Sequence, residues 1–177
     1  VYKRQSVTGR RDALRHHSPW PAVAPWPTVS ILLSSHRSDR LAHALSMVRA
    51  QDYPNLQVIV VLHGDDDFVS HHTPNVHQSL VGWSGDLVVM GVSPEQTLGH
   101  ALAAASARAE GELLAKMDDD DFYSATHIWD LVLARMYSGA QIVGKALDWI
   151  YLTHADTTVF RPTHPAERFA KFVAGGT

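Results

Sequence analysis

The 177-residue sequence predicts an α/β fold: a mostly parallel sheet flanked by helices. Short apolar segments typical of buried strands alternate with segments that have the periodicity of amphipathic helices. This alternation is typical of right-handed strand–helix–strand units, which build parallel sheets. Polar loops follow three of the predicted strands, at 34–37, 63–67 and 118–121. In a parallel sheet these loops share one edge, where open α/β sheets bind ligands.

The first two predicted strands are 29–33 and 57–62, and the second is apolar on both faces. Between them, Ser38 is a favoured N-cap residue for a helix, and Pro54 marks the end of the helical region. The apolar side chains of this helix fall on one face, at Leu41, Ala44, Leu45 and Val48. Residues 68–85 are polar and irregular, and no element is predicted for them.

A third strand is predicted at 87–90 and a fourth at 113–117. Residues 93–96 (Ser-Pro-Glu-Gln) have the form of a capping box with proline at the first helical position, so a helix is predicted to begin there. Its apolar face is formed by Leu98, Ala101, Leu102 and Ala105.

The last predicted elements follow the fourth strand. Ser124 is predicted to cap a helix that stops at Gly139. Residues 141–144 and 147–152 have the apolar character of further strands.

The composition excludes several classes of protein. Hydrophobic residues make up 45% of the chain, which is typical of a globular protein. The net charge of −3 provides no general attraction to nucleic acid, so no nucleic-acid partner is expected. The absence of cysteine excludes disulfides, a thiol nucleophile and a cysteine-based zinc site. No apolar run approaches the roughly 20 residues of a membrane span, and a cytoplasmic location is expected.

Residues 1–27 are predicted to form a leader or linker ahead of a domain at 28–177. The first 15 residues carry five Lys or Arg and one Asp, and four prolines and two tryptophans follow them. Prolines at this density favour an extended chain. Residues 1–15 could contact anionic lipid at the inner face of a membrane or an acidic partner, and a solvated tail is the alternative.

The most informative segment is the run of four aspartates from Asp118 to Asp121, directly after a predicted strand. Adjacent like charges repel, so a cation beside them would stabilise the run. Hard cations such as Mg²⁺ bind one or two carboxylates together with substrate phosphates, which predicts a metal site. A solvated acidic loop is the alternative. An EF-hand is excluded because its glycine and glutamate positions hold Tyr123 and Trp129, whereas a two-metal nuclease or polymerase site stays open.

Three segments resemble family 2 glycosyltransferases of the GT-A fold, a Rossmann-like fold. Residues 27–37 resemble the first strand and loop of that family, and 58–65 resemble its second strand and acidic turn. Residues 109–121 resemble its helix end, strand and Asp-x-Asp motif, and the whole resemblance covers roughly residues 27–152. It implies a metal-dependent donor domain that transfers a sugar from a UDP- or GDP-linked donor, with inversion. The acceptor stays open among glycans, lipids and cell-wall precursors.

The resemblance also implies roles for individual residues. Asp120 matches the carboxylate that holds the metal, Mn²⁺ or Mg²⁺, which would neutralise the diphosphate leaving group. His36 stands where the family often has a tyrosine facing the base, and His63 where it often has an aspartate that reads uracil. Weaker discrimination between bases is therefore expected. The implied nucleotide-binding residues are Ser34, Ser35, His36, Arg37, His63, Asp118 and Asp119.

No catalytic residue is identified within the chain. Inverting members of the family use a later carboxylate as general base, which is expected after a strand beginning at 175–177. The fold is therefore expected to be incomplete on its C-terminal side. Two alternatives stay open: a nucleotide-sugar binding module without turnover, and a nucleotidyltransferase. The second would carry a glycine-rich loop after the first strand, and residues 34–37 contain no glycine.

Overall fold

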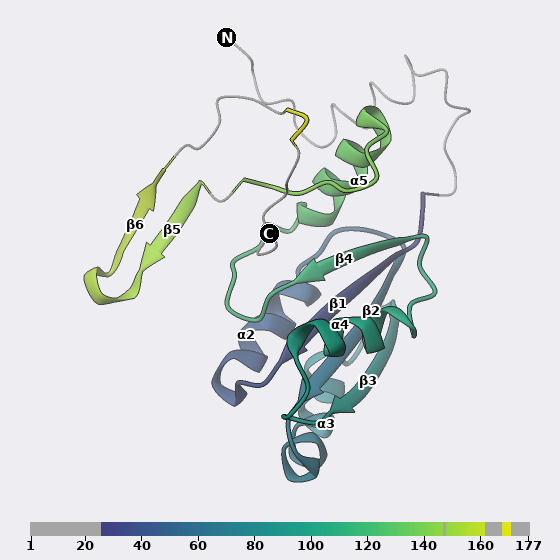
Figure 1. Cartoon of the computed structure of the whole chain (residues 1–177), viewed down its shortest axis with the longest axis vertical. Helices are drawn as coiled ribbons and strands as arrows, with labels where there is room; N and C mark the ends of the chain where they lie inside the picture. The colour runs from purple at the N-terminus through teal and green to yellow at the C-terminus, as the bar shows by residue number, and fades with distance from the viewer. Residues whose placement is uncertain (1–25, 147, 162–167, 171–177) are drawn as a thin grey trace. The chain divides into compact units, whose positions relative to one another are not determined.

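A four-stranded parallel sheet, with strand order β3–β2–β1–β4, forms the centre of the N-terminal part of the chain (Figure 1). The strands are β1 (Val29–Ser35), β2 (Leu56–His63), β3 (Asp86–Val92) and β4 (Leu113–Met117). All four strands predicted in this region are confirmed. Because β4 lies on the opposite side of β1 from β2 and β3, the winding reverses between β1 and β4. The crevice at such a switch point is where open α/β sheets bind ligands.

This computed structural model describes residues 26–146, 148–161 and 168–170. The chain forms two compact units, Val1–Asp130 and Leu131–Thr177. The segment predicted to be a basic leader, up to residue 25, lies outside the described residues. So does the strand expected at 175–177.

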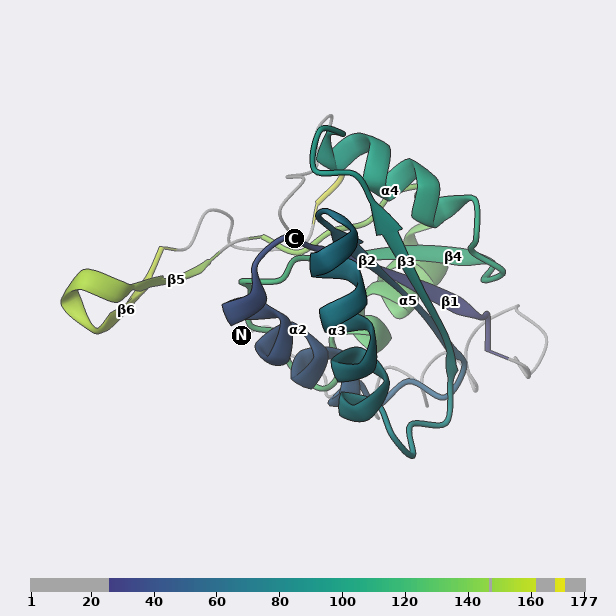
Figure 2. The same cartoon turned by 90° about the horizontal axis from the view of Figure 1, so that it is seen from below.

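Helices cover both faces of the parallel sheet (Figure 2). Helices α2 (Ser38–Arg49) and α3 (Asp66–Ser79) lie on one face, and α4 (Leu98–Ser106) lies on the other. The side chains that α2 buries are the predicted Leu41, Ala44, Leu45 and Val48. The small side chains of Ala101 and Ala105 let α4 pack closely on Leu32, Ile59 and Val61 of the sheet. Burial of β2 between the two helical layers explains why its sequence is apolar without alternation.

Helix α3 lies where the sequence predicts no element. The carboxylate of Asp65 caps it by accepting a hydrogen bond from the backbone N–H of Phe68, at 2.8 Å. Val76 is its fully buried residue. Pro74 lies inside the helix, where proline removes a backbone hydrogen bond, and this residue conceals the helical pattern.

The predicted starts of α2 and α4 are wrong. Residues 93–96 form a turn in which the N–H of Gln96 donates to the carbonyl of Ser93 at 3.0 Å. Helix α4 begins after Thr97, whose hydroxyl accepts from the N–H of His100 at 3.2 Å and so acts as the cap. Ser38 is the first residue of α2 and not its cap; the cap position is held by Arg37, whose side chain makes no capping bond.

The end of the predicted leader packs against the first unit. The rings of Trp26 and Trp129 lie 5.1 Å apart in an edge-to-face arrangement. The carbonyl of Trp26 accepts a hydrogen bond from the amide of Asn55, and the carbonyl of Pro27 accepts one from the hydroxyl of Tyr53, both at 2.6 Å. Residues 26 and 27 are therefore anchored to the body that carries the sheet.

In the second unit, the strand predicted at 141–144 is wrong, since these residues lie outside any strand. Trp149–Leu152 forms β5, but it pairs antiparallel with β6 (Thr157–Phe160) and not with the parallel sheet. A short helix, η1 (Thr153–Ala155), makes the turn between the two strands. Residue 147, where the strand was predicted to begin, lies outside the described residues.

Helix α5 (His127–Ser138) follows the predicted pattern at its C-terminal end. The N–H of Gly139 donates to the carbonyl of Arg135 at 3.1 Å, and Gly139 has a φ of 65°, the left-handed conformation typical of helix ends. At the other end, the predicted cap at Ser124 is wrong, because the helix begins three residues later at His127; the N–H of His127 donates to the carbonyl of Ser124 at 2.9 Å in the turn before the helix. Among the described residues, no helix combines the length and apolar character needed to cross a bilayer.

A buried polar network fixes the turn into β4. The hydroxyl of Ser30, which is fully buried, donates to the side-chain oxygen of Gln57 and accepts from the N–H of Gly111 at 2.9 Å. The same oxygen of Gln57 accepts from the N–H of Glu110, also at 2.9 Å. The turn before β4 is thereby tied to β1 and β2.

Ser30→Ala is expected to lower the free energy of unfolding by about 1–2 kcal/mol, because the N–H of Gly111 loses its acceptor. Urea unfolding of the variant and the parent measures the difference. The control is Ser46→Ala, which removes an exposed hydroxyl that donates within α2, and it should change stability by less than about 0.5 kcal/mol. Equal effects of the two substitutions would contradict a structural role for the network.

Candidate functional site

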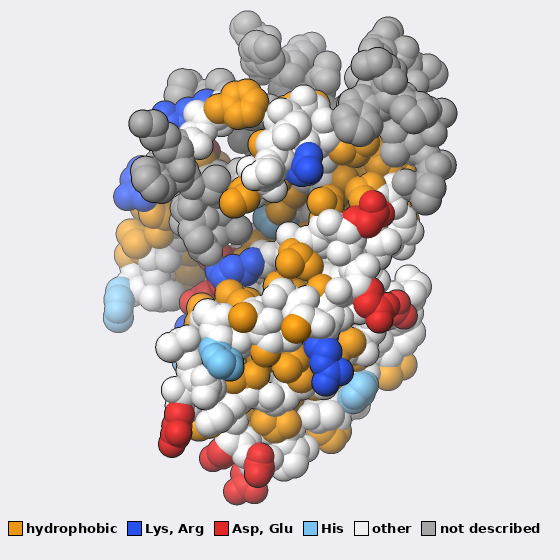
Figure 3. All heavy atoms as spheres, turned by 45° about the vertical axis from the view of Figure 1, so that its right-hand side comes forward, with side chains coloured by type: hydrophobic (Ala, Val, Ile, Leu, Met, Phe, Trp, Pro, Cys, Tyr) orange, Lys and Arg blue, Asp and Glu red, His pale blue; other side chains and the backbone are white. Residues whose placement is uncertain are grey.

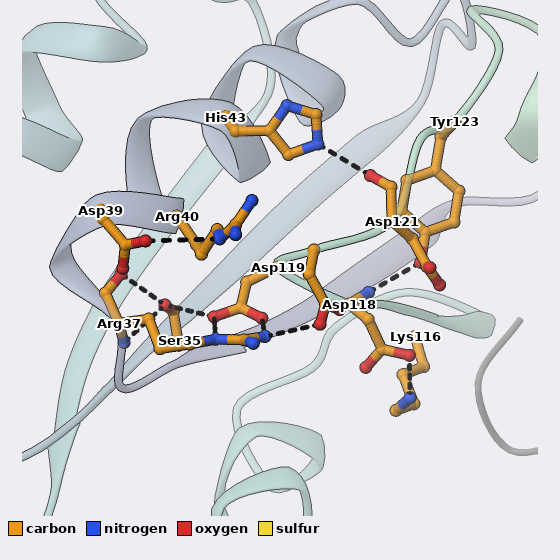
Figure 4. A network of polar contacts seen from close by, with 11 residues as sticks. Ser35, Arg37, Asp39, Arg40, His43, Lys116, Asp118, Asp119, Asp121 and Tyr123 are labelled. Atoms are coloured by element: carbon orange, nitrogen blue, oxygen red, sulfur yellow. Dashed lines mark hydrogen bonds and ion pairs between the residues drawn. The ribbon is translucent and has the colours of Figure 1, made fainter. Parts of the chain in front are cut away.

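The loops after β1 and β4 meet at the switch point of the sheet. Leu33 of β1 pairs in register with Met117 of β4, so Ser35 and Asp119, two residues further along each strand, come level with each other. Arg37 follows in the first loop, and the run from Asp118 to Asp121 forms the second. Figure 4 shows these side chains converging from the two loops.

Asp119 is the buried member of the acidic run, with 5% of its surface exposed. The hydroxyl of Ser35 donates to its Oδ2 at 2.6 Å, and Nε of Arg37 donates to the same oxygen at 3.3 Å. Nη2 of Arg37 donates to Oδ1. Burial raises the pKa of Asp119, but the hydrogen bonds from Arg37 and Ser35 outweigh it and hold that pKa below its usual value. The carboxylate therefore stays ionised and joins the two loops.

Asp120 is more open to solvent, with 49% of its side chain exposed. Its Oδ2 lies 3.0 Å from Nη2 of Arg37, so one guanidinium contacts two consecutive aspartates. Asp118 has a different partner. Its Oδ2 accepts a hydrogen bond from Nζ of Lys116, which lies in β4 directly before the acidic run. Four identical residues thus occupy distinct environments.

Asp121 is contacted by a residue of helix α2 and by a residue of its own loop. Nε2 of His43 on α2 lies 2.9 Å from the carbonyl oxygen of Asp121. The hydroxyl of Tyr123 donates to Oδ2 of Asp121 at 3.3 Å and accepts from the N–H of Asp118 at 2.8 Å. Burial and the neighbouring carboxylates of Asp118 and Asp120 raise the pKa of Asp121. The loop therefore has an excess of negative charge.

The donor set of this loop fits a hard divalent cation that is shared with a phosphate ligand. Within the described ranges, no group of three or more histidine, aspartate and glutamate side chains is arranged to hold a metal ion without further ligands. Mg²⁺ and similar cations, however, are commonly held by one or two carboxylates together with substrate phosphates. Asp118 and Asp120 supply two such carboxylates, and the adjacent negative charges of the run favour a cation beside them.

The two histidines implied in base recognition come together on neighbouring loops. The rings of His36 and His63 lie 6.5 Å apart at an interplanar angle of 75°. Nε2 of His63 is 3.0 Å from the carbonyl oxygen of Gln96, in the loop after β3. A surface pocket of about 350 Å³ lies next to Gly64, the residue after His63. Residues 64–66, 69 and 91–94 line it. Ser34 lies half-buried within β1, one residue before Ser35.

Sequence reasoning missed His43 and Tyr123. His43 lies on α2 and reaches Asp121 only because the helix packs beside the loop, a contact that no local pattern indicates. Tyr123 could have been noticed, since a hydroxyl two residues after Asp121 is within reach of the same loop. The face in Figure 3 shows acidic, basic and hydrophobic side chains interspersed over the described part of the chain, in keeping with the small net charge.

Comparison with solved structures shows the GT-A fold predicted from the sequence. Staphylococcus aureus TarS, residues 1–349, aligns with a TM-score of 0.53 and 18% identity over 68% of this chain. The same TarS fragment in complex with UDP-GlcNAc aligns with a TM-score of 0.51, also at 18% identity over 68% of this chain and 37% of that one. The mannosyltransferase PcManGT from Pyrobaculum calidifontis, in complex with GDP-Man and Mn²⁺, aligns with a TM-score of 0.49 and 22% identity over 73% of this chain and 38% of its own.

The chain spans 39% of the length of the TarS fragment. A search of curated protein sequences found no match. Residues 30–161, which are most of the chain, match the sequence model of glycosyl transferase family 2. The family resemblance found in the sequence is thereby confirmed, and the chain belongs to glycosyl transferase family 2.

Proposed function

We propose that this chain is the donor-binding part of a metal-dependent glycosyltransferase, and that the loops after β1, β2 and β4 bind a nucleoside-diphosphate sugar. The observation that carries the proposal is the junction of Ser35, Arg37 and Asp119 at the switch point. This junction holds the carboxylates of Asp118 and Asp120 at the edge where such sheets bind ligands. Membership of the family supports the reaction class. The TarS complex with UDP-GlcNAc, which has this fold, supports the ligand class.

Asp118 and Asp120 would hold Mn²⁺ or Mg²⁺. When bound, this cation would neutralise the diphosphate leaving group as the glycosidic bond breaks. Asp120 suits the role because half of its side chain is open to solvent. Asp119 suits a positioning role, since Ser35 and Arg37 engage both of its oxygens. The aspartates of the run thus have two proposed roles: Asp118 and Asp120 would bind the cation, and Asp119 would hold the two loops together.

At the other end of the site, His36 and His63 would face the nucleobase. His36 directly follows β1 and His63 is the last residue of β2, and their rings lie 6.5 Å apart. An imidazole can donate to a carbonyl oxygen, and uracil and guanine both carry one. The pair therefore supports binding of both UDP- and GDP-linked donors. The acceptor would be a hydroxyl of a glycan, a lipid or a cell-wall precursor, which would attack the anomeric carbon of the donor sugar with inversion as the nucleoside diphosphate leaves.

Calorimetric titration of the chain with UDP and with GDP, in Mn²⁺ and in EDTA, tests this function. We expect each nucleotide to bind about tenfold or more tightly in Mn²⁺, because the cation joins the carboxylates to the diphosphate. UMP is the matched control, since it lacks the second phosphate and should gain less from the metal. Equal affinities in Mn²⁺ and EDTA would exclude the metal role. Absence of binding under both conditions would exclude donor binding.

A further inference from the structure

The guanidinium of Arg37 contacts two carboxylates that have different surroundings. Asp119 is 5% exposed and receives hydrogen bonds from Nε and Nη2 of Arg37 and from Ser35. Asp120 is 49% exposed and meets Arg37 through Nη2 alone, at 3.0 Å. The carboxylate best placed for a metal ion therefore already has a positively charged partner in Arg37.

The two contacts differ in how easily they break. Removing a partner from a buried ion pair is costly because it leaves a charge without compensation, whereas an exposed ion pair contributes little. Arg37 can therefore release Asp120 while it keeps Asp119. A guanidinium has five N–H donors in a rigid plane that suits phosphate oxygens, and Nη1 of Arg37 makes neither of these contacts to Asp119 and Asp120.

We propose that Arg37 is a positioning residue that couples metal binding to diphosphate binding at this site, an inference that rests on the proposed function. Without nucleotide, the guanidinium competes with a divalent cation for Asp120. With nucleotide, the guanidinium donates to a phosphate oxygen through its remaining N–H groups and releases Asp120 to the cation. Each ligand therefore raises the affinity of the other, and by linkage the two factors are equal.

The neighbouring Arg40 provides a matched control. It lies three residues further along, at the start of α2, and its Nε is 3.4 Å from Oδ2 of Asp39. Both side chains of that pair are largely exposed, at 48% and 73%. Removing the charge of Arg40 changes the net charge of the chain as much as removing that of Arg37, but it leaves the contacts of Asp119 and Asp120 in place.

The test measures Mn²⁺ binding by electron paramagnetic resonance of the free ion, with and without saturating UDP. In the parent, UDP is expected to raise the affinity for Mn²⁺ by about tenfold or more. In Arg37→Gln, the affinity without UDP should rise several-fold, and the gain from UDP should fall several-fold, to the part that direct contact between the cation and the diphosphate supplies. Arg40→Gln should match the parent.

Arg37→Gln leaves the buried carboxylate of Asp119 without the guanidinium that pairs with it, which lowers the stability of the fold. A second variant therefore tests the same coupling without an unpaired buried charge. Arg37→Gln combined with Asp119→Asn makes the pair neutral and should show the same loss of coupling. Parent-like coupling in both Arg37 variants, or weaker Mn²⁺ binding without UDP, would overturn the role of Arg37 and leave the proposed function standing. A parent chain that binds neither UDP nor Mn²⁺ would overturn both.

Discussion

Asp119→Ala is expected to lower the free energy of unfolding by about 3 kcal/mol at neutral pH, because it removes one side of a buried ion pair. The carboxylate of Asp119 is 5% exposed and joins the loop after β1 to the loop after β4 through Ser35 and Arg37. Its loss leaves the hydroxyl of Ser35, which is buried, without this acceptor. Urea unfolding in EDTA measures the change without any contribution from a bound metal.

The effect of Asp119→Ala should depend on pH. Although burial raises the pKa of Asp119, its hydrogen bonds with Arg37 and Ser35 hold that pKa below the usual value. A carboxyl group of this kind stabilises the fold fully above its unfolded pKa of about 3.9, and the contribution is lost as the pH falls through the folded pKa. The stability difference between parent and variant should therefore be constant from about pH 7 to 5 and shrink below about pH 4.

Asp39→Ala is the control for this experiment. Asp39 is 73% exposed and pairs only loosely with Arg40, so its removal should change stability by less than about 0.5 kcal/mol at each pH. A difference between the parent and Asp119→Ala that stays constant down to about pH 3 would show that the carboxylate does not carry the effect. A variant as stable as the parent would contradict the role of the junction itself.

The parts of the fold that the sequence predicts are those set by local patterns. The four parallel strands are apolar runs, and the buried face of α2 follows from the spacing of Leu41 to Val48. Helix α3 could not be predicted in the same way, because Pro74 contradicts its pattern. The strand at Trp149–Leu152 is local, but its pairing with Thr157–Phe160 depends on a partner that sequence spacing does not identify.

The site shows the same division. The shared edge of a parallel sheet places the loop at Ser35–Arg37 and the acidic run together, and this follows from the alternation of strands and helices alone. Four consecutive aspartates are identical as letters, so only the packed structure separates the buried Asp119 from the half-exposed Asp120. The sequence therefore identifies the acidic run, and the structure distinguishes Asp119, which positions the two loops, from Asp120, which is open to a ligand.

Asp120→Asn is expected to remove most of the gain in UDP affinity that Mn²⁺ gives the parent, a loss of about tenfold or more. The substitution keeps the shape of the side chain and removes the charge that a hard cation requires. Its cost in stability should be small, because Asp120 is 49% exposed and its one ion pair with Arg37 lies at the surface. Binding and folding therefore separate in this variant.

Asp86→Asn is the matched control, an exposed aspartate at the start of β3, at the end of the sheet opposite the loops of the site, whose replacement should leave UDP binding within about twofold of the parent. In EDTA, the parent and Asp120→Asn should bind UDP with the same weak affinity, because the carboxylate acts through the cation. A loss of affinity that persists in EDTA would mean that Asp120 contacts the nucleotide directly. If Asp120→Asn binds UDP in Mn²⁺ as tightly as the parent, another carboxylate of the run holds the metal. Asp118 would then be the next residue to replace, because its Oδ2 already contacts a cation, the ammonium of Lys116.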